Sequence, residues 1–456
     1  MKRYITSDEA SEIVTQLGLE FAVINNPDNV YPPFEIYPLT PKIQEAQKQL
    51  SSIVMNLEGI FASSEMLHLH SLEYMVRQIS GRFEKEQWVG LDKIIDYPNL
   101  LNGSNANPVE FLIQRYHNFI KLDFFKEAYL HSALWTLILG KDEKRKEVVR
   151  KNLKDLGCGD LLNDPKLVEY VAQKEFGKYN ANVITNYFLH KYDLNLTLQN
   201  FIITARAASD IYFKRVHEIL ELIKLGEGNN LAKEFFPGSE KLFVEPVAGI
   251  ATMIAIVKGW LGGDAEFIFN ELNDTLKKNS SQNYRISDIE STRSNLKRLS
   301  LEFEKRPLAI ALVSTETQYD TSIIINEALN IISSQIRRLK ITEERKNLLI
   351  EKFSDYRNIF DTIVTFNDIS KSRQKPFRDL YSTALSQLGL HQMRFNEILG
   401  IENSENGIIS MRTSGIGLTV AIPPFKSNTQ NLSEASFIAG GGIPEILLNY
   451  NCFFSF

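Results

Sequence analysis

The sequence contains few of the residues that build disulfide frameworks and metal sites. Its 456 residues include only two cysteines, Cys158 and Cys452, which are far apart and form no CxxC pair. We therefore expect both thiols to be reduced and structural. The seven histidines form no HExxH arrangement, which excludes a zincin-type metal site.

Long apolar runs and an excess of positive charge are also absent. The longest apolar runs, at residues 133–139 and 247–257, are shorter than the roughly 20 residues that a membrane-spanning helix needs. The net charge of -5 provides no basic field for a nucleic-acid backbone or an anionic membrane surface. The first residues lack the apolar core of a signal peptide. We expect a cytoplasmic protein that binds neither nucleic acid nor membranes.

Helical periodicity dominates what is present. Apolar residues recur at three- and four-residue steps along most of the chain, which is typical of amphipathic helices. Short apolar runs near flexible residues indicate strands in the second half only. The sequence therefore predicts a mainly α fold, a multi-helix bundle with a few short strands in the C-terminal half. The expected strands are 308–314, 407–411 and 418–422, and the expected helices include 41–57 and 376–400.

Two polar stretches divide the chain into three expected regions. Residues 99–108 are rich in Asn and Gly, and residues 277–283 read KKNSSQN, which are compositions of surface loops. The expected regions are an N-terminal helical region with a Pro-rich surface segment (1–105), a central helical domain (106–280) and a C-terminal helical domain with a Gly-rich loop (281–456).

One histidine lies on the apolar stripe of a predicted helix. On the helix expected over 376–400, this stripe directs the imidazole of His391 into the core. Gly389 beside it leaves space for a flat ligand such as a haem, whose iron an axial histidine would hold. The alternative is a core histidine that is hydrogen-bonded to a carbonyl. The residues of the stripe are Leu380, Ala384, Leu388, His391 and Phe395.

A short glycine-rich segment follows that histidine. In the segment TSGIGLT, the residues Ser414, Gly415, Gly417 and Thr419 offer hydroxyls and backbone N–H groups that could cradle a phosphate or a propionate. Neither a GxGxxG nor a P-loop pattern is present, so a tight turn between strands is the alternative interpretation.

Four segments of the chain resemble the haem-dependent indoleamine 2,3-dioxygenase superfamily, which includes monodechloroaminopyrrolnitrin synthase-like proteins. The resemblance implies that His391 is the axial ligand of the haem iron and that Ser414, Gly415, Gly417 and Thr419 form the loop beside the haem. It also implies a substrate site near Arg215 and His217, where the dioxygenases carry an arginine that meets the substrate carboxylate. The segments are YFKRVHEILELIKLGEGNN, VAGIATMIAIVKGWLGGDAEFIFNEL, LSQLGLHQMRFNEIL and TSGIGLTVAIPPF.

The function that this resemblance implies is a haem-binding oxidoreductase or oxygenase that acts on an aromatic or amino-acid-derived small molecule. Two alternatives stay open. The segments EPVAGIATMIAI, VSTETQYDTS and MRTSGIGLTVAI are similar in order to those of the galactokinase and mevalonate kinase family, which implies a degenerate phosphotransferase. The other alternative is a non-catalytic helical interaction protein whose glycine segments are ordinary turns.

Overall fold

The computed structural model divides the chain into two compact units, of which the second is an insertion in the first. Unit 1 comprises residues 1–63 and 244–456, and unit 2 comprises residues 64–243. The three-part division expected from the sequence stays a prediction. Cys452 lies outside the described residues. The described residues are 11, 20–26, 31–44, 50–82, 90–101, 108–177, 180–235, 241–279, 286, 288–370, 373–423, 431–449 and 453.

Unit 1 is built on a six-stranded parallel sheet with the strand order β10-β9-β8-β3-β6-β7. The mainly α fold expected from the sequence is therefore wrong, and strands are not confined to the second half. The central strand β3 was missed because it reads SIVMN without polar alternation, as buried parallel strands do. The strands of this sheet are β3 (Ser52–Asn56), β6 (Ala309–Val313), β7 (Thr362–Val364), β8 (Ile398–Glu402), β9 (Leu418–Ala421) and β10 (Phe437–Ile438).

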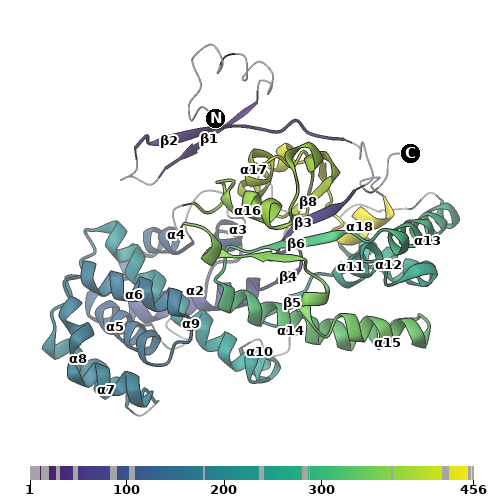
Figure 1. Cartoon of the computed structure of the whole chain (residues 1–456). Coiled ribbons are helices and arrows are strands. Elements are labelled where there is room, and N and C mark those ends of the chain that lie inside the picture. The colour runs from purple at the N-terminus through teal and green to yellow at the C-terminus, as the bar shows by residue number, and fades with distance from the viewer. Residues whose placement is uncertain are drawn as a thin grey trace. The chain divides into compact units, whose positions relative to one another are not determined.

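Helices cover both faces of this sheet, and Figure 1 shows α16 and α17 above the strands and α14 and α15 below them. One face packs a cluster of fully buried apolar side chains against α16 and α17, with Val54, Ala311 and Leu380 among its members. The helices of unit 1 are α11 (Ile250–Val257), α12 (Ala265–Asn279), α13 (Ile289–Lys305), α14 (Gln318–Ile336), α15 (Glu343–Lys352), α16 (Asp379–Gln387), α17 (Glu405–Ser414) and α18 (Ile443–Leu448).

Three segments of unit 1 differ from their predicted form. The strand expected at 407–411 is part of α17, which Ser404 caps by accepting a hydrogen bond from the backbone N–H of Gly407. The second half of the helix expected over 41–57 forms β3. The helix expected over 376–400 ends at Gln387, and β8 begins at Ile398. The strands predicted at 308–314 and 418–422 are present as β6 and β9.

A two-stranded hairpin also belongs to unit 1. Strands β1 (Phe21–Asn25) and β2 (Phe34–Pro38) pair antiparallel. One face buries Ile24 and Tyr37 against Phe377, which lies in the loop before α16. A second short antiparallel pair, β4 (Ala62–Ser63) with β5 (Glu245–Pro246), joins the chain where it leaves and re-enters unit 1.

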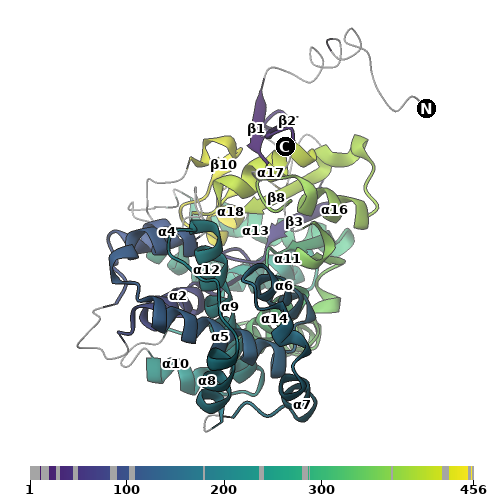
Figure 2. The same cartoon turned by 90° about the vertical axis from the view of Figure 1, so that its left-hand side faces the viewer.

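Unit 2 is a helical bundle, shown from another side in Figure 2. Helix α5 is apolar on nearly all sides because α2, α8 and α9 pack around it. Among the described residues of the whole chain, no helix has both the length and the apolar character to cross a membrane. The helices of unit 2 are α2 (Glu65–Ser80), α3 (Asp96–Leu101), α4 (Pro108–Arg115), α5 (Leu122–Ile138), α6 (Glu143–Asp155), α7 (Pro165–Gln173), α8 (Ala181–Lys191), α9 (Phe201–Lys224) and α10 (Gly228–Phe235).

Candidate functional site

The topology of unit 1 indicates where a ligand would bind. After β3 the chain continues to β6 and β7 on one side, then returns to place β8, β9 and β10 on the other side of β3. In open parallel sheets, ligands bind outside the carboxyl ends of the strands at the point where the strand order reverses in this way. The residues that end β3 and β8 are Asn56 and Glu402. We call the group Asn56, Ser314, Lys375, Glu402 and Asn403 the carboxyl-edge site.

Polar side chains meet at this point in one hydrogen-bonded network. The ammonium of Lys375 donates to Oδ1 of Asn56 over 2.8 Å and also bonds to the carboxylate of Glu402. The amide nitrogen of Asn56 donates to Oδ1 of Asn403 over 3.0 Å and to the backbone carbonyl of Glu58 over 2.6 Å. Residues 56, 375 and 403 are far apart in sequence, so only the fold brings them together.

Glu402 is the buried anion of the site. Its side chain is fully buried, and its two oxygens accept hydrogen bonds from Lys375, from the Tyr381 hydroxyl at 2.8 Å, and from the backbone N–H groups of Asn403 and Ser404. Burial alone would raise the pKa of Glu402, but the charge of Lys375 and the donated hydrogen bonds hold this pKa below its ordinary value. Glu402 is therefore ionised, and both of its carboxylate oxygens already accept hydrogen bonds.

Two glycines let the backbone approach this network closely. A β-carbon on Gly407 would lie 2.0 Å from the carboxylate carbon of Glu402, and one on Gly59 would lie 2.3 Å from the amide nitrogen of Asn403. Gly59 also has a φ of +76°, which an L side chain rarely adopts. The chain after β3 and the chain after β8 therefore both need glycine where they pass the site.

Two helices begin at the same edge because they follow parallel strands. Helix α14 starts five residues after the end of β6, with Thr317 as its cap, and α17 starts three residues after the end of β8, with Ser404 as its cap. The buried hydroxyl of Ser314 lies just past β6, where Val313 pairs with Asn56. Helix N-termini carry partial positive charge, so this edge favours an anion.

The oxygen atoms at this edge would suit a hard cation rather than a haem iron. Carboxylates and amide oxygens are ligands of Mg²⁺, whereas haem iron takes imidazole, thiolate, thioether or phenolate ligands. The half-buried Glu58 lies two residues past β3, and its backbone carbonyl accepts a hydrogen bond from Asn56. The side-chain oxygens of Glu402, Asn56 and Asn403 already accept hydrogen bonds, so a cation held here would have to displace one of these donors.

His391 does not occupy the position that was predicted for it. It lies in the segment between α16 and η6 (Gln392–Glu397), outside any helix, and its side chain is exposed. The predicted stripe ends with α16, because Gly389 adopts a φ of +66° just after the helix. An exposed imidazole on the amino side of β8 cannot project into a buried haem cavity, so the haem proposal is wrong.

The predicted glycine-rich loop lies at the opposite edge of the sheet. Ser414 ends α17, Gly415 caps it with a φ of +111°, and Gly417 directly precedes β9, in which Thr419 is buried. These residues form a tight turn between α17 and β9, whereas the alternative interpretation was a turn between two strands. A strand of five residues separates the two edges by on the order of 15 Å. Ser314 follows β6 at the carboxyl edge, so the segments of the kinase resemblance form no common nucleotide site.

The predicted substrate residues lie on α9 in unit 2. The guanidinium of Arg215 donates to Nε2 of His70 over 3.2 Å and pairs with Glu218. His217 points in another direction, is buried, and lies with its Nε2 3.9 Å from a carboxylate oxygen of Asp142. The structure thus does not bring Arg215 and His217 together in one site.

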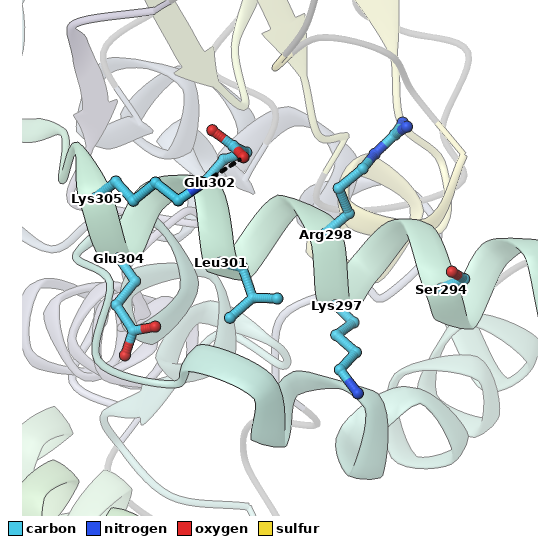
Figure 3. Close-up of a pocket in the computed structure, with 7 residues that line it drawn as sticks. All are labelled: Ser294, Lys297, Arg298, Leu301, Glu302, Glu304 and Lys305. Carbon is cyan, nitrogen blue, oxygen red and sulfur yellow. Dashed lines mark hydrogen bonds and ion pairs between the residues drawn. The ribbon is translucent and has the colours of Figure 1, made fainter.

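Two surface hollows of unit 1 offer less chemistry than the carboxyl-edge site. One, of about 360 Å³, is lined by residues of α13 alone, and Figure 3 shows their side chains pointing in different directions. Lys305 pairs with Glu302 of the same helix, and Lys297 pairs with Glu266. The other, of about 380 Å³, lies beside the loop of Lys375 and includes Arg373.

The sequence did contain a signal for the residues that were missed. Both SIVMN and ILGIE are five-residue apolar runs that end in a polar residue, and each is followed within five residues by a glycine. Polar residues directly after buried parallel strands gather at one edge of the sheet. Reading 41–57 and 376–400 as helices concealed both strand ends.

Comparisons with known proteins give weak likenesses only. No protein-family model matches the chain, and no curated protein matches it. CbbY from Rhodobacter sphaeroides in complex with phosphate matches at a TM-score of 0.32 and 12% identity, over 87% of this chain and 96% of that chain. A HAD hydrolase of family IA, variant 3, from Entamoeba histolytica matches at a TM-score of 0.31 and 12% identity, over 85% of this chain and 92% of that chain. β-Phosphoglucomutase from Clostridium difficile matches at a TM-score of 0.26 and 11% identity, over 85% of this chain and 90% of that chain.

All these TM-scores are below 0.5, so the likenesses give no support to any activity of this chain. The parallel sheet and the exposed His391 correct the oxygenase interpretation and its haem cofactor. The helical interaction protein and the kinase-like alternative are likewise unsupported, because the first assumed no sheet and the second needs a loop that lies at the wrong edge.

Proposed function

We propose that unit 1 binds a small phosphorylated molecule at the carboxyl-edge site. The observation that carries the proposal is the position of Lys375, whose ammonium reaches the ends of both β3 and β8 where the strand order reverses. Lysine is a common phosphate ligand, acting as a point charge beside backbone N–H groups. A phosphate ester fits an edge where an ammonium and two helix N-termini meet.

The charge arrangement suits a phosphate better than a neutral ligand. Lys375 is neutralised by Glu402, but only two of its three N–H donors are used, by Asn56 and Glu402. The hydroxyl of Ser314 adds a further donor on the other side of Asn56, and the partial positive charge at the N-terminus of α14 favours an anion there. A phosphate oxygen can therefore take the third donor of Lys375 without breaking the pair with Glu402.

Calorimetric titration of the full chain in the presence of Mg²⁺ tests this proposal. Inorganic phosphate and glucose 6-phosphate should both bind, and glucose should not. A Lys375→Met, Glu402→Gln double variant removes both charges together, so neither is left buried and unpaired. It should stay folded by circular dichroism and lose phosphate binding. Equal binding by the wild type and the double variant, or binding of glucose alone, would contradict the proposal.

A further inference from the structure

We infer that Asn56 makes this a site that binds a phosphate ester without cleaving it, and that a carboxylate at position 56 would add phosphoryl transfer. The inference rests on the proposed function, since it concerns the same ligand. Covalent phosphoryl transfer in proteins needs an activated nucleophile, such as an aspartate, whose oxygen attacks phosphorus. The described residues of the carboxyl-edge site supply none in a reactive form.

The amides and the glutamate of the site are unsuited to attack. Asn56 and Asn403 carry amides, which are not nucleophiles. Glu402 is an ionised carboxylate, but it is fully buried, and both oxygens already accept hydrogen bonds from Lys375, Tyr381 and two backbone N–H groups. Moving it onto phosphorus would break that network and leave the ammonium of Lys375 without its partner.

The two hydroxyls at this edge, Ser314 and Ser404, lack a base that is free to take a proton, because Glu402 already accepts hydrogen bonds from Lys375, Tyr381 and two backbone N–H groups. Ser404 donates to Glu402 over 3.0 Å, so its proton is committed to a structural bond. Ser314 accepts hydrogen bonds from the backbone of Glu316 and from Thr321. Within the described part of unit 1, the one histidine is His391, which is exposed on the amino side of β8. Serine without a neighbouring base is a weak nucleophile.

Position 56 has the geometry that a carboxylate nucleophile requires. Oδ1 of Asn56 lies 2.8 Å from the ammonium of Lys375, which would keep an aspartate ionised. Asparagine and aspartate have nearly the same shape, so the substitution adds charge without adding volume. The second oxygen would replace the donor to Asn403, whose amide can rotate to donate in return, and the donor to the backbone carbonyl of Glu58, which would lose this partner.

The added reaction balances with water as the only co-reactant. In an Asn56→Asp variant, a carboxylate oxygen forms a bond to phosphorus while the ester P–O bond breaks. The alcohol oxygen leaves with the electron pair and takes a proton from water. A second water then attacks the acyl phosphate, which releases inorganic phosphate and restores the carboxylate.

Release of p-nitrophenol from p-nitrophenyl phosphate with Mg²⁺ measures the effect. The wild type should show no hydrolysis above that of the Lys375→Met, Glu402→Gln variant. Asn56→Asp should raise the rate by about 100-fold or more over the wild type, which corresponds to about 2.7 kcal/mol of barrier. Asn270→Asp is the matched control, because it makes the same substitution at an exposed position of α12 outside the carboxyl-edge site, and it should add no activity.

The outcomes separate this inference from the proposed function. Hydrolysis by the wild type that Ser314→Ala abolishes would overturn the inference and leave phosphate binding intact. An Asn56→Asp variant that binds glucose 6-phosphate in the calorimeter but releases no p-nitrophenol would also overturn it. Absence of phosphate binding by the wild type would instead remove the proposed function.

Discussion

Arg373 donates a hydrogen bond of 2.7 Å to Oε1 of Glu35, a residue 338 positions earlier in the chain, and another of 3.3 Å to Oε2. The same guanidinium bonds to Asp379 at the start of α16 and to the hydroxyl of Tyr37. Arg373 lies two residues before Lys375. The β1–β2 hairpin is therefore fastened to the loop that supplies the ammonium of the carboxyl-edge site.

We expect Glu35→Gln to weaken that attachment. Loss of the charge-assisted bonds should lower the free energy of unfolding by about 1 kcal/mol and reduce phosphate binding, because the loop of Lys375 becomes less well positioned. Urea denaturation and calorimetric titration measure the two effects. Glu344→Gln, at an exposed position of α15, is the control and should change neither. Weaker binding in the control as well would argue against a specific role of the hairpin.

Glu402→Gln should be strongly destabilising. The variant leaves the ammonium of Lys375 buried without its partner, which typically costs about 3–5 kcal/mol. Chemical denaturation should show this loss at pH 7, and Glu344→Gln again serves as the control. A loss below about 1 kcal/mol would mean that water reaches Lys375 and that the pair is not buried as described.

The same pair predicts a dependence of stability on acid. The pKa of Glu402 in the folded chain is below its ordinary value of 4.5. The unfolded chain therefore binds the proton first, so the stabilisation is complete above pH 4.5 and is lost as the pH falls through the folded pKa. The free energy of unfolding of the wild type, measured by denaturant titration at several pH values, should fall with pH in this acid range. That of Glu402→Gln should depend less on pH.

Gly407→Ala should disturb the site through shape alone. Its β-carbon would lie 2.0 Å from the carboxylate of Glu402, so the carboxylate or α17 must move, at a cost of about 1–3 kcal/mol. Gly440→Ala is the matched control, because no atom lies within 4 Å of the added β-carbon. The midpoint temperature of thermal unfolding should be lower than that of the wild type for Gly407→Ala only. Equal midpoints would show that the site adapts to the methyl group.

In unit 2, His70 should make stability fall in mild acid. Burial, with the nearby charge of Arg215, lowers the pKa of His70 to about 3. An unfolded histidine takes a proton below pH 6.5, so stability should fall by on the order of a few kcal/mol as the pH decreases from 6.5 towards 3. His70→Gln should reduce this dependence, and the exposed control His117→Gln should not. An NMR titration in which His70 gains its proton near pH 6.5 would contradict the expected burial.

Some of the fold could be predicted from the sequence because its cause is local. The helices of unit 2 carry their own signals, such as the cap that Asp142 supplies to α6 and the apolar positions along α5. The runs at β6 and β9 are apolar and bounded by flexible residues, and they were identified as strands. Apolar residues spaced three or four positions apart are enough to identify a helix that buries one stripe of its surface.

The central strand and the site could not be read in the same way. A strand buried on both faces, such as β3, has no alternation, so its apolar run also fits a helix. The stripe through His391 had helical spacing, yet the chain turns at Gly389 and the imidazole lies in water. Periodicity indicates which residues could share a face, but it does not fix where a helix ends.

The sequence by itself determined which chemical groups are available, namely the amide of Asn56, the ammonium of Lys375 and the carboxylate of Glu402. Tertiary structure alone decided that they meet, because residues 56, 375 and 402 come together only when β8 pairs with β3 in a parallel sheet. The pairing of distant strands depends on burial across the whole unit, and no short window of sequence contains that information.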